Sequence, residues 1–487
     1  MKISKAKLNI VSNITSQLVT IICGLIVPRI LLGTFGSERY GLTVSITQLL
    51  SFIALFEGGI GGVARARMYD PLAHNDKKEL SAVFRAEQSF FRHIGAVFIV
   101  YSVALGIGFK EIAHAGGYTR SYLFMLVMAI SLYSASKYFF GLPNLTLILA
   151  DQKKYVYSRI MIATTLLNTL AVIVLVNCDL DILWVKLGSS LVFVLRPVMY
   201  ALYTKKHYDL QKTEKAALEQ KWTGIGQHIA FYLHMNADII LLTLFADMKW
   251  VAVYSVYSMV IVNIRSLTES FTGSMEASFG ELIAKKQQAK LLSTYKKYSG
   301  LITAVTIVLF SCTGILILDF VRIYTKGVTD ADYWQPAFAM IMIAAEALNC
   351  LALPPASLPI AANQLKQTRW GAYGEALINI AVSLALIKWD PLAGVALGTL
   401  AATAFRSVYY VLYASREVLH ISAGVQVIKL FSFITAILLM SAGGLRLLSL
   451  VQMGDLFRWC IYAAAFFAAL AAPAFFILKA YLRKING

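Results

Sequence analysis

Apolar segments long enough to cross a lipid bilayer recur along almost the whole of this 487-residue chain. A transmembrane helix needs about 20 predominantly apolar residues, and hydropathy together with loop charges indicates about 14 segments of that kind. Hydrophobic residues make up 58% of the sequence and charged residues 14%, against roughly 25% charged residues in soluble domains. We therefore predict an all-α polytopic membrane protein with about 14 transmembrane helices. The predicted spans are residues 8–32, 40–64, 90–109, 120–149, 159–178, 182–203, 225–246, 251–275, 299–319, 334–361, 371–388, 391–413, 427–447 and 458–480.

Lysine and arginine residues are distributed unequally between the two sets of loops. The N-terminus, the alternate loops on its side and the C-terminal tail hold 28 of them, and the opposite loops hold nine. Because cytoplasmic loops carry the excess of Lys and Arg, both termini are predicted to be cytoplasmic. The same distribution explains most of the net charge of +18, so we expect no nucleic-acid partner.

The chain contains an internal repeat. When residues 30–45 are set over residues 240–255, five of the sixteen positions are identical. This offset of 210 residues relates spans 1–6 to spans 7–12 in the same orientation, and parallel repeats of this kind are a transporter architecture. The sequence therefore predicts two pseudo-symmetric six-helix lobes followed by two extra C-terminal helices. The predicted divisions are residues 1–222, 223–426 and 427–487.

Ten charged residues lie inside the predicted spans, where charge is costly and usually functional. Six cations against four carboxylates predict a cationic interior that suits an anionic substrate headgroup. For Arg29, Lys186 and Arg406 the alternative is that the side chain reaches back to the membrane interface. The cations are Arg29, Lys137, Lys186, Arg196, Arg265 and Arg406, and the carboxylates are Glu57, Asp238, Glu269 and Glu346.

Two pairs of ionisable residues within the spans have the four-residue spacing that places side chains on one helix face. His234 and Asp238 form one pair, which could act as a proton relay or as a structural hydrogen bond. Arg265 and Glu269 form the other, which either neutralises itself or releases one member when substrate binds. Arg29 lies off the polar face of its own span and would turn inward only if the helix breaks at Pro28.

No catalytic constellation is visible, and the stretches outside the predicted spans reach only about twenty residues. The five cysteines show no CxxC pair, so neither a metal site nor a disulfide framework is predicted. We therefore expect a protein that is not an enzyme. A membrane polymerase or ligase of surface polysaccharide is the alternative from a different class.

Three stretches resemble the polysaccharide exporters of the multidrug/oligosaccharidyl-lipid/polysaccharide superfamily, specifically O-antigen or capsule repeat-unit flippases of the Wzx type. They are "GLIVPRILLGTFGSERYGL" (24–42), "EGGIGGVARARMYDPLA" (57–73) and "NADIILLTLF…VAVYSVY" (236–257).

The resemblance implies a two-lobed carrier that moves a polyprenyl-pyrophosphate-linked oligosaccharide across the bacterial inner membrane. Transport would proceed by alternating access through a cationic central cavity, with no cofactor beyond a coupling H⁺ or Na⁺. A polysaccharide polymerase and glycosyltransferases would be partners. A lipid II-type flippase and a cation-coupled multidrug exporter of the same superfamily remain alternatives, and the second would favour an acidic cavity. The candidate substrate-binding residues are Arg265, Lys137, Arg29, Arg196, Glu57 and Glu269, and the candidate ion-coupling residues are His234 and Asp238.

Overall fold

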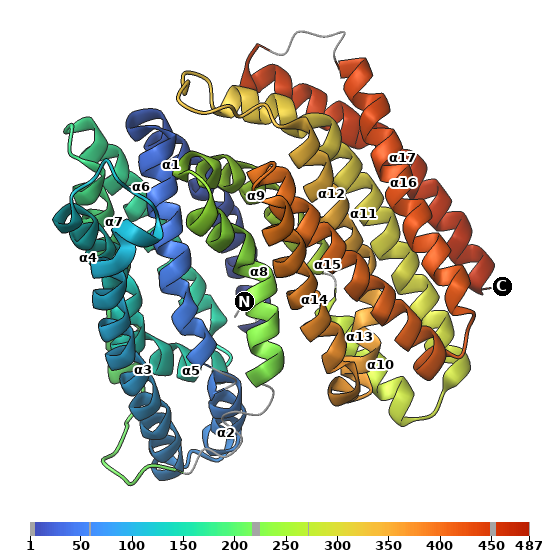
Figure 1. Ribbon diagram of the computed structural model, residues 1–487. Coiled ribbons are helices and arrows are strands. Elements are labelled where there is room, and N and C mark those ends of the chain that lie inside the picture. The colour runs from blue at the N-terminus through green and yellow to red at the C-terminus, as the bar shows by residue number, and fades with distance from the viewer. Residues whose placement is uncertain (1–4, 58–59, 217–224, 271, 449–453, 487) are drawn as a thin grey trace. The chain divides into compact units, whose positions relative to one another are not determined.

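The computed structural model describes residues 5–57, 60–216, 225–270, 272–448 and 454–486, and these residues form helices and no strands (Figure 1). Within them, side chains are not described at residues 5–7, 225–231, 234, 273, 274, 365 and 486. The first elements are α1 (Lys5–Leu50), η1 (Ser51–Phe56), α2 (Ile60–His74), α3 (Lys77–Ile112), α4 (Arg120–Ser136), η2 (Lys137–Gly141), α5 (Leu142–Ala150), α6 (Lys154–Asn177) and α7 (Ile182–His207). The later elements are α8 (Ile225–Phe245), α9 (Met248–Glu269), α10 (Gly273–Ala284), α11 (Gln288–Tyr324), α12 (Pro336–Leu351), α13 (Leu353–Ala361), α14 (Leu365–Leu386), α15 (Pro391–Tyr413), η3 (Ala414–Leu419), α16 (Ala423–Leu448) and α17 (Leu456–Asn486).

The predicted fold class, an all-α polytopic membrane protein, is confirmed. A lipid interior offers no water to backbone N–H and C=O groups, so a spanning segment must satisfy them within its own helix. Eleven helices in the described part of the chain are long and apolar enough to cross a membrane. Spans 1 and 2 of the predicted fourteen fall together in Leu8–Phe56, and span 7 lies in α8, where Met235–Phe245 forms a shorter apolar helix. Span 11 lies in α14, whose first half carries Lys366, Arg369 and Glu375 and is less apolar.

Gly36 separates the first two predicted spans inside α1. The 46 residues of α1 would extend about 69 Å as one straight helix, more than twice the ~30 Å of hydrocarbon in a bilayer. Gly36 has φ 78° and ψ 174°, which no helical residue adopts. A side chain would be strained at this positive φ, so glycine is the residue that allows the break. The chain therefore makes two spans, as predicted, joined at one residue.

The chain divides into two compact units, Met1–Ile229 (unit 1) and Ala230–Gly487 (unit 2), which have the same order of elements. The short helix α2 and the long helix α3 of unit 1 correspond to α10 and α11 of unit 2. The interrupted helix α4–η2–α5 corresponds to α12–α13, and α6 and α7 correspond to α14 and α15. The helices α16 and α17 have no counterpart in unit 1 and run beside α11 (Figure 1). The predicted boundary after residue 222 lies outside the described residues.

Unusual backbone conformations recur at the repeat interval. Asn75 and Lys286, which are 211 residues apart, both have positive φ, 55° and 53°, before the long helix of their unit. Gln152 and Asn363 are also 211 residues apart, and both have φ 56°. A non-glycine residue rarely adopts this conformation, so its recurrence at one interval supports the internal repeat independently of sequence identity.

The clearest sequence match between the units lies in α7 and α15. "LGSSLVFVLRPVMYALY" (187–203) set over "LGTLAATAFRSVYYVLY" (397–413) gives seven identities in seventeen positions at the predicted offset of 210. These identities include an arginine, Arg196 and Arg406, and a glycine, Gly188 and Gly398. The repeat therefore extends to the last shared helix of each unit.

We expect Gly398→Ala to destabilise the protein more than Gly188→Ala. A Cβ at Gly398 would clash with Oγ of Ser383 and lie 2.8 Å from the backbone oxygen of Asn379, so α14 and α15 would have to separate. A Cβ at Gly188 would meet only the end of the Leu175 side chain, at 2.5 Å, which can rotate away. Overpacking of this kind costs about 1–3 kcal/mol. The measurement is the thermal unfolding temperature of each purified variant, and equal temperatures would contradict the close helix approach.

Candidate functional site

An ion pair joins the second and fourth spans of unit 1. Lys137 Nζ lies 3.0 Å from Oε1 of Glu57, and the Tyr138 hydroxyl donates to the same oxygen at 2.5 Å. Lys137 begins η2, a single π-helical turn between α4 and α5, and turns of this type occur frequently at functional sites. The Lys137 and Glu57 side chains are both partly exposed. The structure thus brings two predicted substrate residues together, and they neutralise each other.

The corresponding spans of unit 2 carry a pair of opposite polarity. Arg265 on α9 donates through Nη1 to both carboxylate oxygens of Glu346 on α12, at 3.1 Å each. Glu269 Oε1 lies 3.2 Å from Arg265 Nε, within ion-pair distance although not aligned for a hydrogen bond. Arg265 and Glu346 are buried, and Glu269 is 41% exposed. The pair predicted from the four-residue spacing is therefore part of a triad in which two carboxylates hold one guanidinium.

Arg196 on α7 reaches only hydroxyl groups on the preceding helix. Its Nε donates to Thr164 Oγ1 at 2.6 Å and its Nη2 donates to Thr165 Oγ1 at 2.7 Å. The guanidinium also lies over the Phe193 ring, 4.2 Å from the ring centroid. Among the described residues, no carboxylate lies within ion-pair distance of this half-buried side chain. Unit 1 therefore holds one membrane-embedded guanidinium whose charge is not neutralised locally.

The equivalent arginine of unit 2 is neutralised. Arg406 Nη1 on α15 lies 3.1 Å from Oε1 of Glu375 on α14, and the Glu375 side chain is 2% exposed. Arg406 follows Arg196 by 210 residues, and Glu375 follows Thr164 and Thr165, the two partners of Arg196, by 211 and 210 residues. The partner of the arginine is thus threonine in unit 1 and glutamate in unit 2, and this difference decides whether the neighbouring arginine keeps its charge.

Asp238 on α8 ends a chain of hydrogen bonds in unit 2. The Thr399 hydroxyl lies 2.9 and 2.7 Å from its two oxygens, and the Tyr254 hydroxyl donates to it at 2.8 Å. Thr399 in turn accepts from Asn379 Nδ2 at 3.3 Å, and Ser383 donates to the Asn379 side-chain oxygen at 3.3 Å. Asp238 is 5% exposed. A buried carboxylate thus accepts from two hydroxyl groups, on α9 and α15, and an amide–hydroxyl pair on α14 extends the hydrogen-bond network.

Unit 1 contains the same amide–hydroxyl pair without the acid. Ser189 on α7 donates to Asn168 Oδ1 on α6 at 2.5 Å, and these residues correspond to Thr399 and Asn379 of unit 2 at offsets of 210 and 211. The position 210 residues before Asp238 is occupied by Pro28. The polar contact between the fifth and sixth spans is therefore common to both units, while the carboxylate is specific to unit 2.

The other predicted site residues are His234 and Arg29. The His234 side chain lies outside the described residues, and its predicted pairing with Asp238 stays a prediction. The partners of Asp238 in the structure are Thr399 and Tyr254.

The helix α1 continues through Pro28, since its only non-helical residue is Gly36. The Arg29 guanidinium folds against Gly33, one turn closer to Gly36. The break at Pro28 that would turn Arg29 inward is absent.

Glu375 was missing from the interior charges identified by sequence, although its signal was present. Glu375, Asn379 and Ser383 recur at four-residue intervals and form one polar stripe on α14. Glu87 on α3 was also missing; it is fully buried and accepts from the Thr146 hydroxyl at 2.7 Å. With Glu87 and Glu375 included, unit 1 has four interior cations and two carboxylates, while unit 2 has two cations and four carboxylates. The predicted excess of cations is therefore a property of unit 1, and unit 2 is acidic. The unit 1 charges are Arg29, Lys137, Lys186, Arg196, Glu57 and Glu87, and those of unit 2 are Arg265, Arg406, Asp238, Glu269, Glu346 and Glu375.

Within the described residues, no three His, Cys, Asp or Glu side chains are placed to hold a metal ion. A monovalent cation makes smaller demands, because neutral oxygens can supply most of its ligands. The oxygens around Asp238 are of that type.

Several solved structures with a similar fold are transporters by name. A lipid II flippase, MurJ, in an inward closed conformation, matches with a TM-score of 0.65 and 14% identity over 98% of this chain and 99% of that chain. An inward-facing MATE family multidrug transporter of the MOP superfamily matches with a TM-score of 0.59 and 11% identity over 82% and 95%. The MATE multidrug transporter DinF-BH matches with a TM-score of 0.55 and 17% identity over 85% and 97%. The sequence matches no family model and no curated protein. At these identities the likeness establishes the fold, that of MOP-superfamily transporters.

We expect Glu346→Ala to destabilise the protein far more than Glu269→Ala. Removing Glu346 leaves a buried guanidinium with one poorly aligned partner, and breaking a buried pair in this way costs about 3–5 kcal/mol. Removing Glu269 leaves the two hydrogen bonds from Arg265 to Glu346 intact, and we expect a loss below ~1 kcal/mol for this more exposed pair. The thermal unfolding temperatures of the two purified variants test the difference. An equal loss in both would show that Glu346 is not the principal partner of Arg265.

Proposed function

We propose that the protein is a flippase that moves a polyprenyl-pyrophosphate-linked oligosaccharide, an O-antigen or capsule repeat unit, across the bacterial inner membrane. The observation that carries the proposal is the state of the two equivalent arginines. Arg406 is held by Glu375, whereas Arg196 donates to two threonine hydroxyls and has no carboxylate partner among the described residues. A guanidinium without a counter-carboxylate inside a span is costly to maintain, and an anionic substrate group supplies the missing charge.

The chemistry of Arg196 suits a phosphate or pyrophosphate group. Its planar fork presents five N–H donors, of which threonine hydroxyls accept two. The remaining donors can bind phosphate oxygens in the paired geometry that arginine favours. The two threonines hold the guanidinium in place, so little side-chain entropy is lost when the anion binds. Arg265 reaches an anion only after leaving Glu346, so we assign it a supporting or switching role.

Asp238 is proposed to couple transport to an ion gradient, of H⁺ or Na⁺. A buried carboxylate that can lose its charge by protonation or by cation binding changes the hydrogen bonds among α8, α9, α14 and α15. In unit 1 the equivalent position is Pro28, so the coupling function would belong to unit 2 alone. The anion and the coupling ion would then be handled by different units.

The structural neighbours support a transport cycle of alternating access. MATE family transporters of this fold have been captured in inward-facing and in outward-facing conformations, and MurJ is a lipid II flippase by name. A lipid II-type flippase would differ in the glycan alone.

The acidic unit 2 is the observation that favours a multidrug exporter for cations, but Arg406 and Arg265 occupy three of its four carboxylates. We propose no catalytic activity, and we propose glycosyltransferases and a polysaccharide polymerase as functional partners.

We expect Thr165→Glu to abolish flipping, because it reproduces in unit 1 the carboxylate that neutralises Arg406 in unit 2. The matched control is Thr165→Gln, which has the same size without the charge and should retain most of the activity. Arg196→Ala should lose activity and Arg196→Lys should recover part of it. Arg196→Ala removes a charge-assisted hydrogen bond to the substrate, which is worth about 1.5–3 kcal/mol. We therefore expect this variant to flip the substrate roughly 10- to 100-fold more slowly.

The measurement is flipping of a fluorescent polyprenyl-pyrophosphate glycan in proteoliposomes, with the unfolding temperature of each variant as a check on folding. Full activity in a folded Thr165→Glu protein would exclude Arg196 as a substrate-binding residue.

We expect Asp238→Asn to make flipping independent of an imposed H⁺ or Na⁺ gradient. Asparagine can still accept from Thr399, but it cannot bind a proton or neutralise a cation. Ser189→Ala, which alters the acid-free counterpart in unit 1, is the control and should leave the gradient response unchanged. Rates are compared in proteoliposomes with and without each gradient. A gradient response that survives Asp238→Asn would make this cluster structural.

A further inference from the structure

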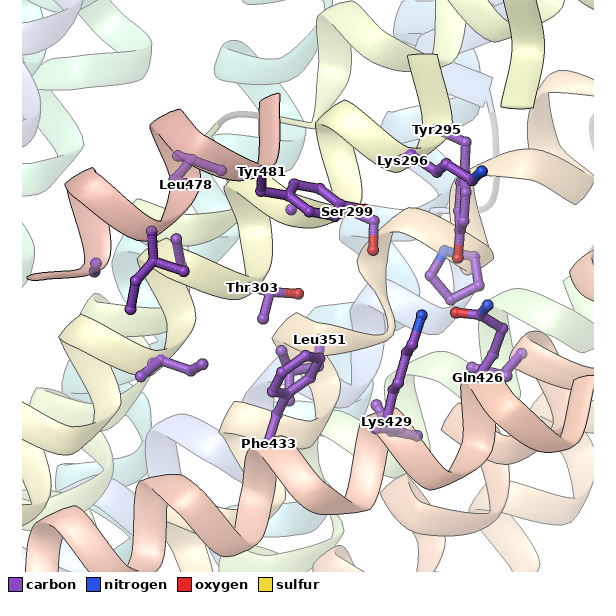
Figure 2. A pocket seen from close by; sticks show the side chains of 18 of the residues that line it. Tyr295, Lys296, Ser299, Thr303, Leu351, Gln426, Lys429, Phe433, Leu478 and Tyr481 are labelled. Atoms are coloured by element: carbon purple, nitrogen blue, oxygen red, sulfur yellow. The ribbon is translucent and has the colours of Figure 1, made fainter. Parts of the chain in front are cut away.

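An open groove of about 560 Å³ lies in unit 2 along the two helices that unit 1 lacks. Its walls are α11, α16 and α17, and its floor is formed by α12, α13 and α15 (Figure 2). The volume lies within the roughly 300–1,000 Å³ of sites that hold small molecules. None of the residues around Arg196, Asp238 or Arg265 lines it. The groove is therefore separate from the site described above.

Most of the groove is lined by apolar side chains. The helices α11 and α17 pack against each other through residues 312–316 and 459–470. The groove lies beside them at residues 295–307 and 470–481. A continuous apolar channel of this shape suits a hydrocarbon chain, since a lipid tail is as apolar as the lining side chains and gains van der Waals contacts with them. The apolar lining includes Ile307, Phe433, Met440, Leu470, Ile477 and Leu478.

One end of the groove is polar and positively charged. Lys429, Gln426 and the Tyr295 hydroxyl point toward one another there, and Lys296 lies on the rim next to Tyr295 (Figure 2). Neither lysine ammonium has a hydrogen-bond or ion-pair partner among the described residues. An ammonium group, a hydroxyl and an amide at the end of an apolar channel match a phosphate attached to a hydrocarbon chain, and Lys296 adds positive charge on the rim.

The charged end lies on the side of the chain that is predicted to be cytoplasmic. Lys296 belongs to the stretch "KKQQAKLLSTYKKY" (285–298), which precedes the apolar part of α11. Anionic lipid heads attract lysines in such a position. The apolar part of the groove then runs from that interface toward the membrane interior, along the direction an acyl chain takes.

We propose that this groove binds one anionic glycerophospholipid of the surrounding bilayer, with its phosphate at Lys429, Gln426 and the Tyr295 hydroxyl, Lys296 adding positive charge on the rim, and an acyl chain along α11 and α17. The proposal goes beyond the proposed function, since this lipid stays in place and is not the transported one. The floor residues Leu351 and Pro355 flank Ala352, where α12 ends and α13 begins. The bound acyl chain would therefore pack against the junction of α12 and α13 and stabilise its conformation. Glu346, the partner of Arg265, lies on α12.

Native mass spectrometry of the full-length protein tests the binding, with phosphatidylglycerol, phosphatidylcholine and a polyprenyl phosphate as separate probes. We expect one phosphatidylglycerol per chain, with phosphatidylcholine bound at least fivefold more weakly. Lys296→Ala/Lys429→Ala should weaken phosphatidylglycerol binding at least tenfold. The matched control is Lys290→Ala/Lys297→Ala, which removes two neighbouring lysines that do not line the groove. Equal retention of phosphatidylcholine, or retention of the polyprenyl phosphate alone, would overturn the proposal.

A second pair of variants tests the acyl-chain channel. Ala474→Trp fills the groove and should prevent binding, whereas Ala472→Trp, on the same helix but outside the lining, should not. Hydrogen exchange of the backbone over residues 348–358 should slow when phosphatidylglycerol is added to the unaltered protein or to Ala472→Trp, and should not slow in Ala474→Trp. Binding that persists in Ala474→Trp would place the lipid elsewhere. If exchange over these residues does not change on binding, the bound lipid does not stabilise the junction of α12 and α13, and that part of the proposal is wrong.

Discussion

A guanidinium inside a membrane-spanning helix has to be compensated from within the protein, and this chain compensates one position in two ways. Arg406 has a carboxylate 3.1 Å away, while Arg196 has two hydroxyl groups. The hydroxyls accept from two of its five N–H donors but leave the charge. The two units thus share their packing and differ in electrostatics, with a cationic unit 1 and an acidic unit 2. The assignment of an anion to one unit and a coupling cation to the other depends on this difference.

The positions of the helices could be predicted from the sequence because a bilayer imposes a local rule. Each span must be apolar over about 20 residues, so hydropathy located nearly all of them. The break at Gly36 lies between predicted spans 1 and 2, because one straight span cannot contain more apolar residues than the bilayer thickness accommodates. The repeat offset of 210 was also visible, although the match between α7 and α15 is clearer than the one first noticed.

The partners of the charged residues could not be predicted in the same way. Lys137 and Glu57 are 80 residues apart in sequence, and Arg265 and Glu346 are 81 apart. No local pattern relates such residues, and the pairs visible in advance were those one helical turn apart, of which Arg265 with Glu269 is in contact and His234 with Asp238 lies partly outside the described residues. Contacts between the fifth and sixth spans form an intermediate case. The stripe from Glu375 to Ser383 could have been found, but its partner Thr399 required the fold.

The residue-by-residue correspondence of the units has an evolutionary consequence. A chain that arose by duplication of a six-helix half inherits two copies of every buried position, each already surrounded by a packing that tolerates it. The two copies can then carry different residues beside the same arginine, as threonine in unit 1 and Glu375 in unit 2 do. New charge arrangements can be sampled in one half without inventing a new core. Families built on such duplicated halves are free to diversify their cargo quickly while their backbone barely changes.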